Sequence, residues 1–388
     1  MYDIIGDIHG YADELELLLA RLNYQRIDGV WQHETRTLVS VGDLVDRGPQ
    51  QKRTVDIIRA MADKGFARVI MGNHEFNAVA YATLGSDGLP LRAHTDKNRK
   101  QHEAFLIEAE ASPAWYAETI SWFMTLPVLL DLQDFRVIHA CWHPESVEIM
   151  KQYCDDRYQL NSTCWEEAND SETDLFNALE ILMKGWELPL PEGYHFFDKD
   201  GHRRDNIRSR WWLEEHGHYR DMAIGVPDLN ALPDAQVPAE QLPGYDNQKP
   251  LFIGHYWLDG KPSSLSDKVI CVDYSVANKG ALVAYRLDEG SISDDNFISV
   301  SSRREGHFSV EDLSMAFYFA DPMHTCCVEN ECTDEYLRIA EHAKSLLETN
   351  VALFDAIKDV LVYSFDEGIV GDYHVVAVLK QLAVRTGK

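Results

Sequence analysis

The feature that most restricts the fold is a pattern that recurs four times in the first 144 residues. Short apolar runs end at a glycine or a polar residue, and segments with helical periodicity, such as 11–22 and 50–61, lie between them. Nearly continuous apolar strands that alternate with helices predict a buried sheet with helices packed against it. The runs are DIIGD (3–7), RTLVSVGD (36–43), ARVIMGN (67–73) and FRVIHA (135–140).

The pattern changes after residue 144. Residues 145–248 lose the alternation and hold acidic stretches, a basic run and a proline-rich loop, so we predict an insertion that shapes the ligand site. Strand signals return within 250–287, where 269–276 and 281–287 are expected to form an antiparallel pair. We therefore expect a main domain at 1–302, followed by a small helical domain at 303–388 that serves docking or oligomerisation.

Charge and composition restrict the class of protein. The 388 residues include 36 basic and 64 acidic side chains, which give a formal charge of −28 at pH 7. An acidic surface repels polyanions at long range, so nucleic acid is disfavoured as a partner. No apolar run is long enough for a bilayer span, no secretory leader precedes the first strand, and the number of cysteines is odd. We therefore expect a soluble cytoplasmic protein with no membrane partner and with reduced thiols.

Side chains that can bind a metal follow each predicted strand. Because the carboxyl ends of parallel strands share one edge of a sheet, side chains just past those ends can converge. Carboxylate, amide and imidazole groups together suit Mn, Fe or Zn. Glycines stand beside most of these positions and let the backbone approach a crowded centre. The residues concerned are Asp7, His9, Asp43, Asp46, Asn73, His74, His139 and His255.

Each of these residues, taken alone, has an ordinary structural explanation. An aspartate after a strand is most often a helix cap or a turn residue, and Asn73 alone would be a turn former. A single histidine is more often a hydrogen-bonded core residue than a ligand. These explanations fail together, because five separate strand-end positions carry ligand-type residues. We therefore predict a metal site at this edge of the sheet.

Five motifs occupy these positions: GDIHG (6–10), GDLVDRG (42–48), GNHE (72–75), the His of VIHA (139) and the GH of FIGH (254–255). Together they resemble the motifs of the calcineurin-like metallophosphoesterases. The GDLVDRGP form is similar to the branch that contains the serine/threonine protein phosphatases and the symmetrical diadenosine tetraphosphate hydrolases. The first 140 residues also resemble the phosphatase module of bacterial polynucleotide kinase-phosphatases. The resemblance does not cover the insertion or the C-terminal segment.

This resemblance implies an α/β (α+β) fold, a four-layer α/β/β/α sandwich, with two divalent cations at its centre. Mn²⁺ is the expected cation, with Fe and Zn as alternatives. The resemblance also implies that Asp43 is shared by both cations, which sets them about 3.5–4 Å apart. The other implied ligands are Asp7 and His9 for one cation, and Asn73, His139 and His255 for the other.

The resemblance also implies a mechanism. A hydroxide held between the two cations would attack phosphorus in line with the leaving oxygen, without a phosphoenzyme. Asp46 would orient His74, which would protonate the departing alkoxide. Arg47 would bind two phosphate oxygens with its planar fork, and Asn73 would also contact the substrate.

Two positions depart from the family pattern. Trp257 stands where many relatives have a second histidine after the GH pair, as in the serine/threonine phosphatase branch. Cys141 stands where glycine is usual, and a small buried thiol is the expected explanation.

The branch usually supplies a second phosphate-binding arginine from the middle of the chain. The run HRRDNIRSRWW (202–212) offers candidates, and strand alternation would place Arg208 and Arg210 on one face. We favour Arg210 and then Arg208. An exposed basic patch that balances acidic neighbours remains an equally good explanation of the run.

The resemblance predicts a metallophosphoesterase, a hydrolase of phosphoric ester bonds. A phosphomonoesterase similar to the serine/threonine phosphatases is the first choice, and a symmetrical diadenosine tetraphosphate hydrolase is the alternative. A rival from another class is a regulatory module that binds a phosphorylated ligand without turnover. Degenerate relatives normally lose ligands, and this chain keeps them, which argues against that rival. The expected partner is a phosphorylated small molecule or a phosphoprotein, with oligomers formed through residues 303–388.

Overall fold

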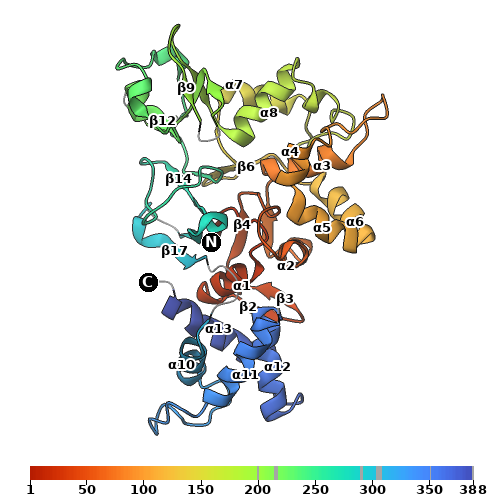
Figure 1. Ribbon diagram of the computed structural model, residues 1–388, viewed down its shortest axis with the longest axis vertical. Helices are drawn as coiled ribbons and strands as arrows, with labels where there is room; N and C mark the ends of the chain where they lie inside the picture. Colours follow the sequence, from red (N-terminus) through yellow and green to blue (C-terminus); the bar gives the residue numbers. More distant parts are fainter. Residues whose placement is uncertain (199–200, 214–216, 289–291, 303–307, 350, 387–388) are drawn as a thin grey trace.

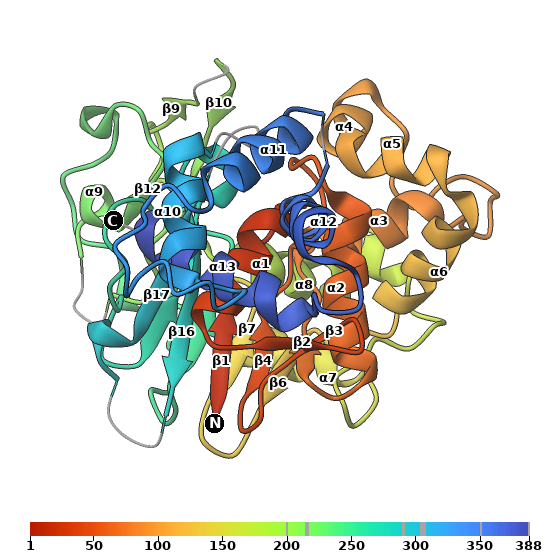
Figure 2. The same cartoon turned by 90° about the horizontal axis from the view of Figure 1, so that it is seen from below.

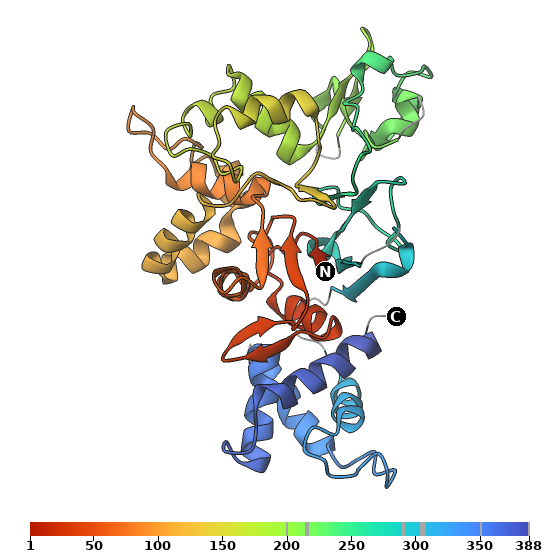
Figure 3. The ribbon, with the colours of Figure 1, turned by 180° about the vertical axis from the view of Figure 1, so that it is seen from behind.

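The computed structural model describes residues 1–198, 201–213, 217–288, 292–302, 308–349 and 351–386. Two β-sheets lie at its centre, with helices outside each sheet (Figure 1). The same stack of layers is visible from behind, with the insertion at one end and the C-terminal helices at the other (Figure 3). The predicted four-layer sandwich is therefore confirmed.

The N-terminal strand lies inside the first sheet. The strands of this sheet are β1 (Tyr2–Ile5), β4 (Thr37–Ser40), β5 (Ala67–Val69), β15 (Asp273–Tyr274), β16 (Ala281–Leu287) and β17 (Phe297–Ser301). β4 is parallel to both β1 and β5, whereas β16 is antiparallel to β1. The parallel strands therefore end at the same edge of the sheet.

The second sheet combines strands from both sides of the insertion. Its strands are β6 (Leu129–Asp131), β7 (Arg136–Ile138), β13 (Leu251–Ile253) and β14 (Val269–Cys271). The predicted antiparallel pairing of 269–276 with 281–287 is only partly right, because β14 pairs in parallel with β13 and only β15 reaches β16. The chain passes from the second sheet to the first at Val272, which is packed in the core between them.

Successive side chains of a strand enter two different cores. Ile4 and Val39 belong to the core between the sheets, together with Phe252. Their neighbours Ile5 and Leu38 belong to the core that the sheets form with the helices. Side chains alternate across a strand, so a strand buried on both faces must be apolar at nearly every position. This burial explains the continuous apolar runs of the sequence.

Helices cover the outer faces of both sheets. In Figure 1, α1 and α2 lie beneath the first sheet, and α7 and α8 lie above the second. The helices up to residue 184 are α1 (Ala12–Arg21), α2 (Gln51–Asp63), α3 (Asn73–Ala82), α4 (Asp96–Gln101), α5 (Glu103–Ala111), α6 (Pro113–Phe123), α7 (Pro144–Lys151) and α8 (Asp174–Lys184). None of the helices in the described part of the chain combines the length and the apolar character that a bilayer span requires.

The predicted insertion, 145–248, begins with the helical layer of α7 and α8 and continues into a small β-rich unit. This unit has an apolar core of its own, which includes Leu188, Ile207 and Met222. Its elements are β8 (Glu187–Pro189), β9 (Phe196–Phe197), β10 (Arg203–Arg204), β11 (Asn206–Ser209), α9 (Tyr219–Met222) and β12 (Ala223–Ile224). The order β12-β11-β8 places β11 in the middle of a three-stranded sheet.

The C-terminal helices pack on the helical layer of the first sheet. They are α10 (Val310–Ala320), α11 (Leu337–Glu348), α12 (Leu353–Phe365) and α13 (Asp372–Thr386). Figure 2, viewed from below, shows α13 across α1, close to the hairpin of β2 (Gln25–Ile27) and β3 (Val30–Gln32).

Specific side chains hold this docking together. The ring of Phe354 lies 6.2 Å from that of Trp31 and 4.3 Å from the Arg26 guanidinium. The Leu353 backbone N–H donates to Asp13 Oδ1 at 3.1 Å. The predicted domain boundary at 302/303 borders residues 303–307, which lie outside the described residues, and the division into two domains stays a prediction.

We expect Phe354→Ala to lower the free energy of unfolding by about 3–5 kcal/mol, because the Phe354 ring is fully buried where α12 packs against Trp31. Tyr363 lies on the same helix and is 81% exposed, so Tyr363→Ala should change that free energy by less than about 0.5 kcal/mol. Urea denaturation of both variants measures the difference. Equal, small losses would contradict the docking of α12.

Candidate functional site

Loops at the carboxyl ends of the strands form the site, and they hold unusual backbone conformations. Six non-glycine site residues have a positive φ: His9 (51°), Asp43 (55°), Asp46 (71°), Arg47 (75°), His255 (70°) and Trp257 (53°). The left-handed region is unfavourable for residues with a side chain. Such conformations persist where the surrounding structure enforces them, which is common at functional sites.

Glycine is required where two of these loops touch. A Cβ at Gly72 would lie 2.2 Å from Asp43 Oδ1, and a Cβ at Gly254 would lie 2.2 Å from Asp7 Oδ1. Neither position has room for a side chain. The glycines therefore allow backbone to lie directly against the two carboxylates.

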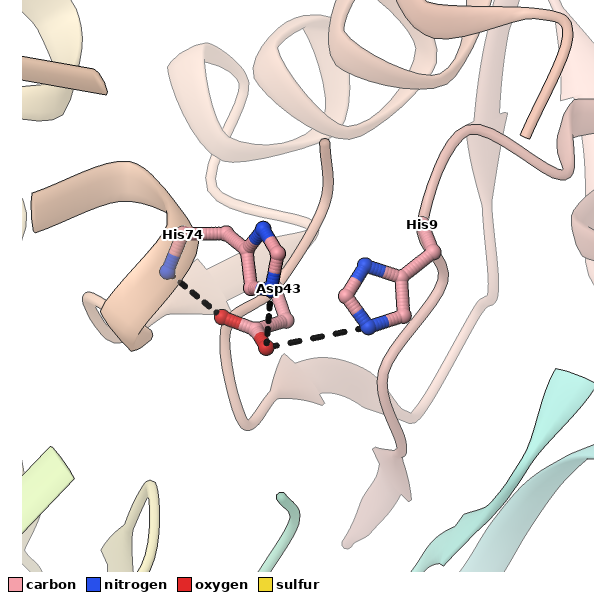
Figure 4. Close-up of side chains that lie close together, drawn as sticks. All are labelled: His9, Asp43 and His74. Atoms are coloured by element: carbon pink, nitrogen blue, oxygen red, sulfur yellow. Dashed lines mark hydrogen bonds and ion pairs between the residues drawn. The ribbon is translucent and has the colours of Figure 1, made fainter. Parts of the chain in front are cut away.

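Asp43 lies at the centre of the site. Its Oδ2 lies 3.7 Å from His9 Nε2, 3.9 Å from His74 Nε2 and 3.3 Å from His139 Nε2. Its Oδ1 accepts a hydrogen bond from the His74 backbone N–H at 3.0 Å. Figure 4 shows His9 and His74 on either side of the Asp43 carboxylate. The amide oxygen of Asn73 lies 3.1 Å from His139 Nε2.

Backbone carbonyls set the orientation of two of these imidazoles. His9 Nδ1 lies 2.8 Å from Val45 O, and His139 Nδ1 lies 2.7 Å from Val41 O. In a neutral imidazole, which is the form that binds a metal, an Nδ1–H that donates to a carbonyl leaves the lone pair on Nε2, on the side of the site. Both Nε2 atoms then point at Asp43, as metal-binding imidazoles do.

The pKa values of these groups reflect burial and the shared carboxylate. Burial lowers the pKa of His9 to about 3. Burial alone would also lower the pKa of His139, but the Asp43 carboxylate raises it to about 10. Burial would raise the pKa of Asp43, but His139 and His74 hold it well below its usual range. The site is therefore built around an ionised carboxylate.

The donors fit divalent cations. His9 Nε2 is buried and has no hydrogen-bond partner among the described residues. Burial and the nearby Asp273 raise the pKa of Asp7 well above its usual range, which reflects the cost of burying several carboxylates together. Cations placed among these groups would offset that cost and would use the unpaired imidazole nitrogen.

Two groups of metal-binding side chains meet at Asp43. In the described residues, His9, Asp43 and His74 form one group and Asp43, His139 and His255 the other, with ligand atoms within 4.8 Å of one another. Asp7 belongs to neither group. Its carboxylate accepts from the His255 backbone N–H, at 3.1 Å for Oδ2 and 3.3 Å for Oδ1. The sharing of Asp43 is what a two-cation site needs.

Asp46 links two histidines. Its Oδ2 lies 2.5 Å from His74 Nδ1, and its Oδ1 lies 2.7 Å from His102 Nδ1. Burial would raise the pKa of Asp46, but these hydrogen bonds from His102 and His74 hold it well below its usual range. Burial would lower the pKa of His74, but Asp43 and Asp46 raise it. A raised pKa favours the protonated form of His74, which a proton donor needs.

Two supporting residues, His102 and Glu75, have no role in the predictions from the sequence. His102 is buried between α4 and α5, and neither a strand end nor a motif marks it. Glu75 closes the GNHE motif and is fully buried, where it accepts from the backbone N–H groups of Asp43 and Leu44 at 2.8 Å each. Burial and the nearby Asp43 raise the pKa of Glu75 to about 7. The position of Glu75 in the GNHE motif was the sequence signal that could have identified it.

Two arginines reach the site from different elements. The Arg47 guanidinium lies 4.1 Å from the centre of the Trp257 ring. Arg208, on β11, donates to the backbone oxygen of His255 at 3.0 Å and lies 5.0 Å from the centre of the Tyr256 ring. Trp257, which stands in place of a second histidine, thus supports an arginine.

The preference for Arg210 over Arg208 has no support in the structure. β11 ends at Ser209, and the Arg210 backbone bonds to Met222 while its side chain is exposed. Arg208 lines the cavity at the site, and Arg210 does not. Strand alternation does not extend to Arg210, because the strand ends before it. Cys141 is fully buried, as expected.

The site opens into two neighbouring cavities. The smaller, of about 350 Å³, is lined by Asp43, His255, Arg208 and Trp257, among others. The larger has a volume of about 900 Å³ and is lined in part by residues of α3 and α4. Both cavities are also lined by Arg47, Asn73, His74 and Lys184.

Comparison with known proteins gives a family and several relatives. The family model of the calcineurin-like phosphoesterases matches residues 2–218. A symmetrical bis(5'-nucleosyl)-tetraphosphatase from Vibrio parahaemolyticus is 33% identical over 302 residues, which cover 74% of this chain and 95% of that protein.

Two further relatives match over shorter stretches. A symmetrical bis(5'-nucleosyl)-tetraphosphatase from Vibrio cholerae is 32% identical over 143 residues, 37% of this chain and 45% of its own length. An asymmetrical bis(5'-nucleosyl)-tetraphosphatase from Bacillus velezensis is 46% identical over 74 residues, 19% of this chain and 30% of its own length. The chain thus spans less than half the length of these two relatives.

We expect Mn²⁺ to stabilise chelator-treated protein, because a cation offsets the burial of the clustered carboxylates. At a free Mn²⁺ concentration 100 times Kd, the free energy of unfolding should rise by about 2.7 kcal/mol. His139→Ala should lose most of this gain, whereas His202→Ala should keep it, since His202 is exposed in the insertion. Thermal unfolding with and without Mn²⁺ measures the effect. A full gain in His139→Ala would contradict this assignment.

Proposed function

The chain belongs to the calcineurin-like phosphoesterase family, and from this premise we propose that it is a metal-dependent hydrolase of phosphoric ester bonds. One observation carries the proposal: Asp43, His139 and His255 bring their ligand atoms together, and Asp43 and His255 line the same cavity as His74, which Asp46 holds. A cluster of metal-binding groups beside a buried proton donor is what phosphate ester hydrolysis needs.

Two divalent cations are the proposed cofactors, with Mn²⁺ as the first choice and Fe or Zn as alternatives. When bound, the cations would neutralise phosphate oxygens and activate a water molecule. Asp43 would be their shared ligand. The remaining proposed ligands are Asp7, His9, Asn73, His139 and His255.

His74 would supply the proton for the leaving oxygen. Asp46 Oδ2 lies 2.5 Å from its Nδ1, and His74 lines the cavity beside the Asp43 carboxylate. Asp43 and Asp46 raise the pKa of His74 against the effect of burial, which favours its protonated form. His102 holds the second oxygen of Asp46, and so fixes the carboxylate that orients His74.

Two arginines would bind the phosphate group. Stacking on Trp257 holds the flat face of the Arg47 guanidinium and leaves its N–H edges free for two phosphate oxygens. Arg208 reaches the same cavity from the insertion and is anchored by the His255 carbonyl. We therefore propose Arg208, in place of Arg210, as the second phosphate-binding arginine.

Two classes of substrate fit this site. A phosphomonoester, on a small molecule or on a protein, needs only the smaller cavity, which is lined by Asp43 and His255 and is called the metal-binding cavity below. A nucleoside polyphosphate is the second candidate, and it is favoured by the relative that matches over 95% of its length and is named for that activity. We also propose a cytoplasmic setting and a docking or oligomerisation role for the C-terminal helices.

The test of the proposal is hydrolysis by the purified protein with Mn²⁺. The substrates are p-nitrophenyl phosphate, a phosphopeptide and diadenosine tetraphosphate. Hydrolysis of at least one of them supports the proposal. Bound metal without hydrolysis of any would favour a regulatory module that binds a phosphorylated ligand.

We expect His74→Ala to lower kcat by roughly 10²–10⁴-fold on a phosphoserine peptide, because its alkoxide leaving group loses its proton donor. Bound metal, measured by elemental analysis, should be retained. His202→Ala serves as the matched control and should keep wild-type kcat. If His74→Ala turned over near the wild-type rate, the acid role would be wrong.

A further inference from the structure

The larger cavity lies on the leaving-group side of the proposed reaction. It has a volume of about 900 Å³ and shares Arg47, Asn73 and His74 with the metal-binding cavity. His74 thus lies at the boundary between the two spaces. Because His74 is the proposed proton donor to the leaving oxygen, the leaving group extends from the metal-binding cavity into the larger one.

The lining of the larger cavity is positively charged, in a chain whose formal charge is −28. Its two carboxylates are Asp46, which two histidines hold through hydrogen bonds, and Glu103. Its basic side chains are Arg47, Arg92, Lys97, Lys100 and Lys184, of which Lys184 pairs with Glu180. Excess positive charge in a recess of an acidic protein concentrates anions there.

Arg92 is oriented by neutral groups. Its guanidinium donates to Asn77 Oδ1 at 3.0 Å, to Asn98 Oδ1 at 3.0 Å and to Gln101 Oε1 at 3.1 Å. The Arg92 backbone N–H is also fixed, because it donates to Ala80 O at 2.9 Å. Amide oxygens from α3 and α4 therefore hold the side chain in place without neutralising its charge.

Two other arginines of low exposure are paired with carboxylates. Arg36 is paired with Asp3 at 3.0 Å, and Arg136 is paired with Asp246 at 2.7 Å. Among the described residues, no carboxylate lies within 4.0 Å of the half-buried Arg92 guanidinium. Partial burial of an unpaired cation is unfavourable, and a bound anion would offset that cost.

We propose that this basic cavity is an anion subsite, in which Arg92, Lys97 and Lys100 bind the phosphate chain of the leaving group. The preferred substrates are then nucleoside polyphosphates, and isolated phosphomonoesters are poorer ones. This inference rests on the proposed function. An anchored arginine and two exposed lysines can together bind a phosphate chain, since arginine binds two oxygens at once and lysine acts as a point charge.

The chemistry of a phosphoanhydride explains why charge is needed there. The oxygen of the attacking water forms a bond to one phosphorus and releases a proton to solvent, and the bond from that phosphorus to the bridging oxygen breaks. The bridging oxygen keeps the electron pair and departs with the rest of the chain. The leaving chain therefore gains negative charge or takes the His74 proton, and cations beside it stabilise the developing charge.

The first test compares two substrates. We expect Arg92→Ala to lower kcat/KM for diadenosine tetraphosphate at least tenfold more than kcat/KM for p-nitrophenyl phosphate. Arg99→Ala is the matched control, because Arg99 is exposed on α4, pairs with Glu110 and does not line the cavity. Its two kcat/KM values should fall by less than twofold. Equal losses on both substrates in Arg92→Ala would overturn the subsite.

The second test needs no turnover. Inorganic tripolyphosphate is titrated into metal-free protein by calorimetry, and Arg92→Ala should weaken its Kd at least tenfold, whereas Arg99→Ala should not. The double variant Lys97→Ala/Lys100→Ala changes only exposed side chains and should weaken Kd in the same direction. It therefore tests the subsite even if Arg92→Ala fails to fold.

The outcomes separate this inference from the proposed function. Tripolyphosphate binding that depends on Arg92, in a protein that hydrolyses no ester, would overturn the proposed enzyme and keep the subsite. Hydrolysis of p-nitrophenyl phosphate, with unchanged tripolyphosphate binding in Arg92→Ala and in Lys97→Ala/Lys100→Ala, would support the proposed enzyme and overturn the subsite. More efficient hydrolysis of a phosphopeptide than of diadenosine tetraphosphate would also overturn the inference.

Discussion

The Asp43 carboxylate is buried among the imidazoles of His9, His74 and His139, and the local structure on every side holds it there. Glu75 binds its backbone N–H, and the absence of a side chain at Gly72 leaves room for its oxygens. A buried carboxylate without a counter-charge would be strongly unfavourable. The arrangement is stable because imidazoles, and cations when bound, share this one charge.

The two-sheet architecture explains how residues so far apart in the sequence reach this carboxylate. β1 and β4 deliver His9 and Asp43 from the first sheet, and β7 and β13 deliver His139 and His255 from the second. The core between the sheets fixes their separation. Stability of the fold and geometry of the site are thus consequences of the same packing.

Much of the fold and of the metal-binding cluster could be predicted from the sequence, because both follow from strand ends. An apolar run that stops at Asp43 or His139 predicts a strand and also predicts that this residue lies at the edge of the sheet where the strand ends. His102 and Arg92 could not be found in this way, because they lie outside the strand ends and the motifs. His102 reaches the site through its hydrogen bond to Asp46, and Arg92 is held by Asn77 of α3. The choice between Arg208 and Arg210 stays a prediction, because it depends on where β11 ends, which the sequence does not state.

The most direct test of the account is an anomalous-scattering map from crystals grown with Mn²⁺. The account predicts two peaks about 3.5–4 Å apart on either side of the Asp43 carboxylate, one towards His9 and the other towards His139 and His255. A map from fully loaded crystals with no peak beside Asp43 would contradict it.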